Sequence, residues 1–211
     1  MRFWLPTRSR ETSSGVRGSR LALVTSLLGF GTALLLASGL AQATSLELEG
    51  TADLTEKSNT IVTGRVVSTE ARMKEEHQFI YTYVTIEVDD VLKGNTAEVG
   101  STIVLEELGG RVGPWIHQVH AVPHYEAGER VLAFLEDREG GLFRTYGMIQ
   151  GKFRFEPNTR TGEEMLTRPA EWTDAYFAAS AIPRDLTVVR ADGSYAAEPL
   201  VSAIRDWVAQ H

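Results

Sequence analysis

The apolar residues of this chain recur at every second position from Thr60 onward, which is the spacing of a β-strand with one buried face. The pattern is clearest in residues 79–92, where one face carries Ile80, Thr82, Val84, Ile86 and Val88. The alternation slips at Asp89-Asp90, which predicts a β-bulge or a strand end before the turn at residues 93–95. We therefore expect one long, curled strand here.

Further segments have the composition of strands, namely residues 60–69, 101–108, 142–149 and 152–155. Gly147 and Gly151 are expected to act as bulges or tight bends. Residues 131–135 are apolar throughout, which is typical of a strand covered on both faces. About five strands, one of them long and bent, imply a small closed β-barrel, an architecture that leaves no exposed sheet edge.

Residues 157–211 have a mixed pattern that begins with a polar, turn-rich loop at 157–163. The expected elements are a helix over 169–181, a small hairpin made by 186–190 and 194–196, and a helix that begins at Pro199. One face of the last helix carries Leu200, Ile204, Trp207 and Val208. We expect this α/β tail to pack on the barrel. Residues 52–58, before the first strand, resemble a short capped helix.

Residues 1–43 have the pattern of a secretory signal peptide. Arginines precede an uncharged apolar run at 21–40, and Ala41-Gln42-Ala43 is the small-residue pattern that a signal peptidase cleaves. The alternative is an uncleaved anchor, because residues 21–40 at about 1.5 Å each just cross a hydrocarbon core of about 30 Å. Glycine, serine and threonine dilute the run, which favours cleavage after Ala43. We thus expect a periplasmic or secreted protein that leaves the membrane, with a barrel at 44–156 and a tail at 157–211.

The chain has no cysteine, which excludes disulfides, thiolate metal sites, cysteine nucleophiles and a lipoprotein anchor. Its stability must come from the core alone, and residues 44–211 are enough for one domain with appendages. Removal of residues 1–43 takes away five of the 21 basic residues and one of the 28 acidic residues, so the net charge changes from −7 to −11. Such an acidic surface repels phosphate backbones, and we expect no nucleic-acid partner.

Five segments resemble a group of secreted bacterial proteins of uncharacterised function, namely IVTGRVVSTEAR (61–72), YTYVTIEVDDVLKG (81–94), LEELGGRVG (105–113), YEAGERVLAFLE (125–136) and MIQGKFRFE (148–156). These blocks are also similar to the netrin and tissue-inhibitor-of-metalloproteinases modules. The resemblance covers about residues 54–156 and implies an OB-like barrel, closed or partly open. The animal inhibitors reach the protease zinc with an N-terminal cysteine. This chain has none, so no functional residue carries over from them.

Residues 109–125 are the best candidate for a binding site. They join two strands over a length that compact domains seldom spend on a bare connection, and long loops on rigid barrels usually carry the binding residues. The candidate binding residues are Trp115, His117, His120 and His124. The glycines at 109, 110 and 113 do not open a helix, so we interpret them as a sharp reversal and not as a phosphate site.

The same three histidines with Glu126 provide an alternative, a zinc-dependent hydrolase. Three imidazoles leave one coordination position for a water that the metal activates, and Glu126 would accept its proton. The spacing matches no helical zinc signature, and Pro114 and Pro123 indicate a loop. We therefore expect no metal or other cofactor.

The sequence carries no convincing catalytic motif. No G-x-S-x-G is present, and adjacent carboxylates such as Glu106-Glu107 are expected to point to opposite faces of a strand and to be solvated. An exposed row of Phe79, Tyr81 and Tyr83 could stack on sugars or bases, although burial in the core or under the tail is favoured. We expect a non-enzymatic module that binds a protein or a glycan, with a protease inhibitor as the more specific version.

Overall fold

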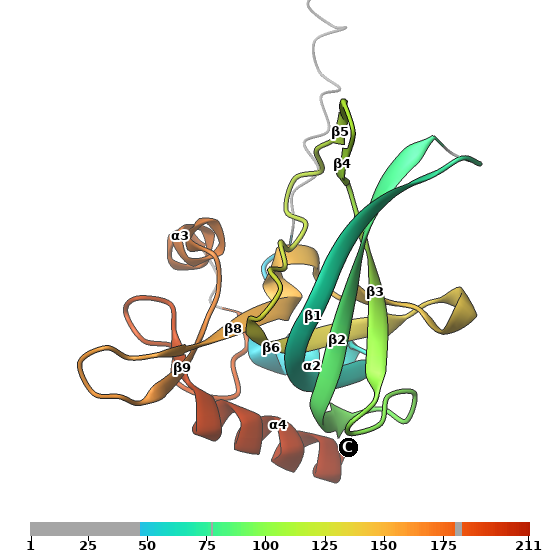
Figure 1. Ribbon diagram of the computed structural model, residues 1–211. Helices are drawn as coiled ribbons and strands as arrows, with labels where there is room; N and C mark the ends of the chain where they lie inside the picture. Colours follow the sequence, from blue (N-terminus) through green and yellow to red (C-terminus); the bar gives the residue numbers. More distant parts are fainter. Residues whose placement is uncertain (1–46, 77, 180–182) are drawn as a thin grey trace, which may run out of the picture. The chain divides into compact units, whose positions relative to one another are not determined.

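A long antiparallel hairpin of β1 (Thr60–Lys74) and β2 (Phe79–Lys93) dominates the computed structural model of this protein (Figure 1). One face of β2 is buried through Ile80, Val84, Ile86 and Val88, as the alternation predicts. The pairing of β2 with β1 skips Asp89, so the predicted bulge is confirmed. β1 extends five residues beyond the predicted end at residue 69 because its outer half pairs with the aromatic start of β2.

The structure describes residues 47–76, 78–179 and 183–211. The expected signal segment 1–43 and its cleavage site at Ala43 lie outside these residues. Residues 47–211 form a unit of their own. Within the described ranges, no helix is both long and apolar enough to cross a bilayer.

Eight of the ten described strands form one sheet in the order β1-β2-β3-β7-β6-β8-β9-β10, and the other two pair with each other in a separate two-stranded sheet. β3 spans Thr102–Leu108, β6 spans Arg130–Asp137 and β7 spans Phe143–Thr145. A further pairing joins β1 to β6, so β1, β2, β3, β7 and β6 are linked in a ring. The ring is uneven, because β3 and β7 pair in parallel at one position only, Leu105 with Phe143. The fold is thus mainly β, as predicted.

β6 separates two apolar cores. Val131, Ala133 and Leu135 belong to the first core, whereas Leu132 and Phe134 point into the second. All five side chains are fully buried, which confirms that both faces of this strand are covered. Besides these β6 residues, the first core includes Val62, Val66, Val84, Ile86, Val88, Leu105, Tyr125 and Phe143.

The second core joins the tail to the ring. It lies among α2 (Thr51–Lys57), β8 (Lys152–Pro157), β9 (Glu164–Thr167), β10 (Tyr195–Ala196) and α4 (Ala197–Gln210). Its fully buried members include Leu54, Phe153, Leu166, Tyr195, Leu200 and Ile204. The chain from β8 to β9 is a hairpin within the same sheet, so the turn-rich loop predicted at 157–163 joins two paired strands. Of the predicted apolar face of the last helix, Leu200, Ile204 and Val208 pack here, whereas Trp207 is half-buried outside this core.

Two predicted elements are wrong. Residues 142–149 do not form one strand, because Gly147 has a left-handed backbone with φ 66° and the short helix η3 (Met148–Gly151) follows it. Residues 186–190 do not form a hairpin with 194–196. β10 pairs with β9 instead, because that pairing buries the Tyr195 ring beside the ring of Phe153.

The remaining short helices are η2 (Glu139–Gly141) and α3 (Ala170–Ala178). α3 follows Pro169, and its described part ends before the predicted limit at residue 181. Trp172 and Tyr176 are buried on one side of α3, whereas Phe177 is exposed.

Candidate functional site

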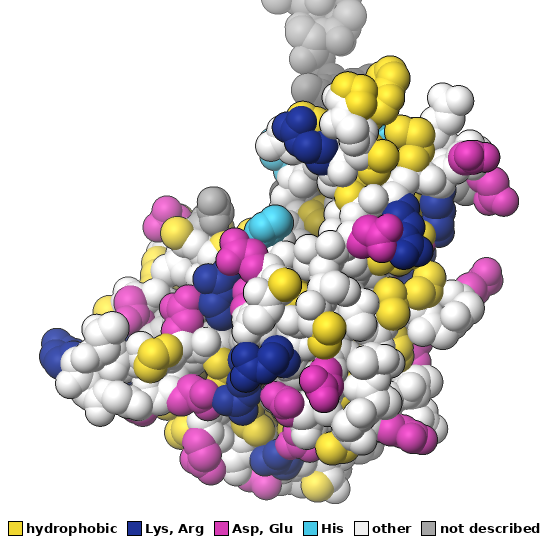
Figure 2. Space-filling view, viewed as in Figure 1, with side chains coloured by type: hydrophobic (Ala, Val, Ile, Leu, Met, Phe, Trp, Pro, Cys, Tyr) yellow, Lys and Arg dark blue, Asp and Glu magenta, His cyan; other side chains and the backbone are white. Residues whose placement is uncertain are grey.

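The segment that follows β3 forms a small hairpin of β4 (Gly110–Val112) and β5 (Trp115–His117). Gly109 and Gly110 have φ of 88° and 131°, so only glycine readily allows the chain to turn here. Near the tip, Trp115 is 63% exposed and Ile116 is 52% exposed. Figure 2 shows hydrophobic side chains gathered at this end of the molecule, over the hairpin and the outer part of β1 and β2. We call Trp115 and Ile116 the hairpin tip.

His117 fixes the hairpin to β2. Its Nδ1 accepts a hydrogen bond of 3.0 Å from the backbone N–H of Ile80, and its ring lies 4.7 Å from the ring of Phe79. The N–H of Gly109 donates to the carbonyl oxygen of Ile80 at 2.9 Å. The predicted binding residue His117 is therefore an anchor of the hairpin, and its Nδ1 lone pair is already used.

The other two histidines stand apart from this anchor. His120 and His124 are exposed, and Nε2 of His124 lies 3.9 Å from Oε1 of Glu126, which is also exposed. In the part of the chain that the structure describes, no group of three or more histidine, aspartate or glutamate side chains is placed to hold a metal ion. The described geometry thus does not bring His117, His120 and His124 together as zinc ligands.

The row of Phe79, Tyr81 and Tyr83 is half-buried and borders the hairpin. The ammonium of Lys74 lies 4.8 Å from the centre of the Tyr81 ring, and the guanidinium of Arg72 lies 5.3 Å from the centre of the Tyr83 ring. Each tyrosine ring thus has a cation over it, and the ring of His117 is tilted by 46° against that of Phe79. The row is therefore neither a core element nor an open stacking platform.

Glu106 supports this aromatic row from β3. Its carboxylate accepts hydrogen bonds from the Tyr83 hydroxyl at 2.8 Å and pairs with the Lys74 ammonium at 2.5 Å. Burial opposes the ionisation of Glu106, but the bonds from Lys74 and Tyr83 outweigh it and hold its pKa below the usual range. The prediction that Glu106 and Glu107 are solvated is wrong, because both side chains are buried on opposite faces of β3.

Glu107 points to the interior side of β3. Its Oε1 accepts hydrogen bonds from the backbone N–H of Thr145 at 2.8 Å and from the Thr145 hydroxyl at 2.6 Å. The same hydroxyl lies 2.7 Å from the hydroxyl of Tyr125. Burial raises the pKa of Glu107, although the bonds from Thr145 act in the opposite direction.

At neutral pH, Glu107→Gln is predicted to raise the free energy of unfolding above that of the parent, and Glu106→Gln is predicted to lower it. A raised folded-state pKa gives stability that is complete below the unfolded-state pKa and lost as pH rises through the folded-state pKa. Glu107→Gln keeps an acceptor for Thr145 and removes this loss, so its free energy of unfolding should exceed that of the parent at neutral pH. Glu106, with its lowered pKa, contributes stability at neutral pH that disappears as pH falls, so Glu106→Gln should be less stable there. Urea unfolding across the acid and neutral ranges tests both variants, and a shift in the same direction for both would contradict the assignment.

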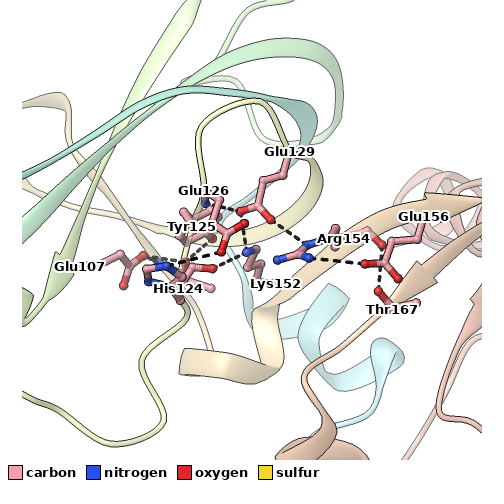
Figure 3. Close-up of polar contacts among 10 residues, drawn as sticks. Glu107, His124, Tyr125, Glu126, Glu129, Lys152, Arg154, Glu156 and Thr167 are labelled. Carbon is pink, nitrogen blue, oxygen red and sulfur yellow. Dashed lines mark hydrogen bonds and ion pairs between the residues drawn. The ribbon is translucent and has the colours of Figure 1, made fainter.

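A buried ion pair holds the chain where the long connection returns to the sheet (Figure 3). Nζ of Lys152 lies 2.6 Å from Oε1 of Glu129 and also donates to the carbonyl oxygen of His124. Nε of Arg154 donates to the other oxygen of Glu129 at 2.9 Å. The side chains of Lys152 and Glu129 are each only 7% exposed, and Lys152 lies 4.5 Å from the centre of the Tyr125 ring. Lys152 thus holds residues 124–129 at both ends, through the carbonyl oxygen of His124 and the carboxylate of Glu129.

A separate open depression of about 620 Å³ lies between the β8–β9 hairpin and α3. Its lining includes Asn158, Thr167, Asp192 and Ser194. None of the residues predicted for binding contributes to it.

Neither a scan against protein-family models nor a search of curated proteins finds a match for this chain. The site is therefore described by its own geometry. That geometry adds Glu129 and Lys152 to the residues considered from the sequence, and it places Glu107, which was expected to be solvated, in the interior. In the sequence these are charged residues beside apolar strand segments. Ordinary surface strands show the same pattern, so the sequence does not predict that these residues are buried.

Proposed function

We propose that this chain is a non-enzymatic, extracytoplasmic binding module that captures a protein ligand with the hairpin tip. The supporting observation is that Trp115 and Ile116, on the two faces of β5, are both exposed on a hairpin that His117 fixes to β2 at its base. Large apolar side chains on a preorganised element are typical of the central contacts of protein interfaces.

The chemistry of the tip favours a protein over a glycan. Glycan sites combine an aromatic platform with several polar side chains that fix the sugar hydroxyls. Beside Trp115 the chain offers Gly113, Pro114 and Ile116, which supply no polar side-chain group, and Arg111, opposite Ile116, is the one exposed polar side chain of the hairpin at 110–117. An aliphatic neighbour suits an apolar patch on a protein.

The proposal includes an OB-type barrel as the scaffold. The order β1-β2-β3-β7-β6, with β6 returning to β1 and β3 parallel to β7, supports this assignment. The resemblance to the netrin and tissue-inhibitor modules is the second support, and the signal-like segment 1–43 supports the extracytoplasmic location. Secreted proteases are accordingly the first ligands to test, in inhibition assays with representative enzymes.

Trp115→Ala is predicted to weaken capture of the ligand by about 30-fold or more, since truncation of a central interface residue costs at least about 2 kcal/mol. The thermal midpoint of the variant should match that of the parent, because the Trp115 side chain is mostly exposed. His117→Ala is a useful contrast. It removes the acceptor of the Ile80 N–H, so it should lower both capture and stability.

A photo-crosslinking amino acid at position 115 can identify the ligand. The matched control places the same amino acid at Val99, which is 66% exposed and lies outside the hairpin. We expect a discrete adduct from position 115 that Ile116→Ser reduces, and none from position 99. Equal adducts from both positions, or a glycan as the only ligand that Trp115→Ala releases, would overturn the proposal.

A further inference from the structure

The outer half of β1 has an open edge. β6 pairs with β1 only from Thr60 to Arg65, and Val66 exchanges backbone hydrogen bonds with Gly128 and Glu129. Among the described residues, no strand or loop forms backbone hydrogen bonds with the outer side of β1 at 67–74. In Figure 1 this part of β1 extends away from the ring, together with the start of β2. An unpaired strand edge is a template for another strand.

The register identifies the residues whose backbone groups face this edge. The backbone of Ile80 faces away from β1, because its N–H donates to His117 and its carbonyl oxygen accepts from Gly109. Met73 lies opposite Ile80, and the pairing is unbroken from residue 68 to residue 74. Opposite residues of an antiparallel pair either bond to each other or both face away. Met73 therefore faces the open edge, as do Ala71 and Thr69, which follow at steps of two.

We propose that two copies of this chain pair through these edges as a symmetric antiparallel dimer with its two-fold axis at Ala71. Ala71 then exchanges hydrogen bonds with Ala71 of the second copy, and Thr69 does so with Met73 of the second copy. The sheets of the two copies continue into each other as β2-β1-β1-β2.

The charges on β1 select this register. Glu70 and Arg72 lie two residues apart on one face of β1, and both side chains are 61% exposed. An axis at Ala71 places Glu70 of each copy opposite Arg72 of the other, so the dimer contains two such pairs. Both are non-hydrogen-bonded pairs, in which opposite side chains lie closest. An axis at Glu70 or at Arg72 places two like charges opposite each other. An axis at Met73 places Arg72 opposite Lys74.

This arrangement also differs from that of a protected edge. Proteins discourage edge pairing with charges that repel an incoming strand. Here the two charges have opposite sign and are related by the same two-fold axis as the backbone groups. The bulge at Val67 ends the paired stretch on one side, and the turn at residues 75–76 ends it on the other.

Charge reversal tests the dimer. The protein is purified as cells process it, and light scattering gives its mass over a dilution series. We expect twice the chain mass for the parent, one chain mass for Glu70→Arg and for Arg72→Glu, and recovery of the dimer in Glu70→Arg/Arg72→Glu. The matched control is Glu136→Arg, which breaks an ion pair with Arg138 at the same spacing outside this edge and should leave the dimer intact. A parent of one chain mass at every concentration, or a dimer that survives both single reversals, overturns the proposal.

A thiol at the axis gives a second, independent measurement. The chain has no cysteine, so Ala71→Cys carries a single thiol. Hydrogen-bonded partners in antiparallel strands have Cα atoms about 5.5 Å apart, which lies within the range of a disulfide. Mild oxidation should link two chains of Ala71→Cys and not of Ser202→Cys on α4, and Glu70→Arg should suppress the link. Equal linkage at both positions, or none at position 71, contradicts the two-fold pairing.

Discussion

Replacement of Glu129 with alanine is expected to lower the free energy of unfolding by about 3–5 kcal/mol, the usual cost of leaving one member of a buried ion pair without its partner. Lys152 is the member left behind, because its ammonium is held at 2.6 Å by Glu129 and is almost fully buried. Burial already lowers the pKa of Lys152, and Glu129 acts against that shift. The variant should also free the chain at His124, whose carbonyl oxygen shares the same ammonium.

Urea unfolding at neutral pH measures the effect, with Glu126→Ala as the matched control. Glu126 is three positions before Glu129, but its side chain is exposed. Its replacement removes one contact, the 3.9 Å approach of its Oε1 to Nε2 of His124. The control should therefore change stability by less than about 0.5 kcal/mol. The double variant Glu129→Leu/Lys152→Met should recover most of the loss, because apolar replacement of a whole buried pair is often neutral. Equal losses for Glu129→Ala and Glu126→Ala would show that the pair is not buried in solution.

The sequence predicts well those elements whose pattern of apolar residues results from burial of one or both faces of a single strand or helix. The alternation in residues 79–92 fixes which face of β2 is buried, and its slip at Asp89 marks the bulge. The continuous apolar run at 131–135 predicts a strand covered on both faces, and the two cores on either side of β6 are the physical reason. The apolar stripe that includes Leu200 and Ile204 predicts the buried face of α4 for the same kind of reason.

The elements that the sequence does not predict depend on contacts between distant segments. Tyr195 joins β9 and not residues 186–190, because only the folded chain places Leu166 beside it. A hairpin at Arg190 and Ser194 is locally reasonable, and the backbone bonds of a turn are present there, but no strand forms before it. Short strands of this kind are decided by tertiary packing and not by propensity.

The candidate site shows the same division. Exposure of Trp115 on the connection between two strands follows from the glycines and Pro114 around it. The role of His117 does not, because its partner is a backbone N–H on β2 that is brought near only when β4 and β5 turn back. Glu107 and Glu129 are equally hidden, since their burial depends on Thr145, Lys152 and the closing of the ring.

Gly64 is the residue at which closing of the ring makes the strictest demand on β1. It pairs with Val88 of β2 on one edge and with Val131 of β6 on the other. The register of β1 and β2 shifts immediately before it, so β1 coils here. A Cβ at this position would overlap the carbonyl oxygen of Glu87 and lie 2.6 Å from Cγ2 of Ile86. This explains the glycine within the segment Val62-Thr63-Gly64-Arg65-Val66.

Gly64→Ala is accordingly expected to lower the free energy of unfolding by about 3 kcal/mol, the upper end of the usual cost of overpacking, because the overlapping atom belongs to a paired backbone and not to a flexible side chain. Gly100→Ala is the control. Gly100 has φ 79° and open space around its Cβ position, so this variant incurs only the cost of a left-handed backbone, about 1 kcal/mol. Urea unfolding of both variants separates the two causes. A loss for Gly64→Ala no larger than that for Gly100→Ala would mean that β1 is not held between β2 and β6, and the ring of five strands would then be open at this edge.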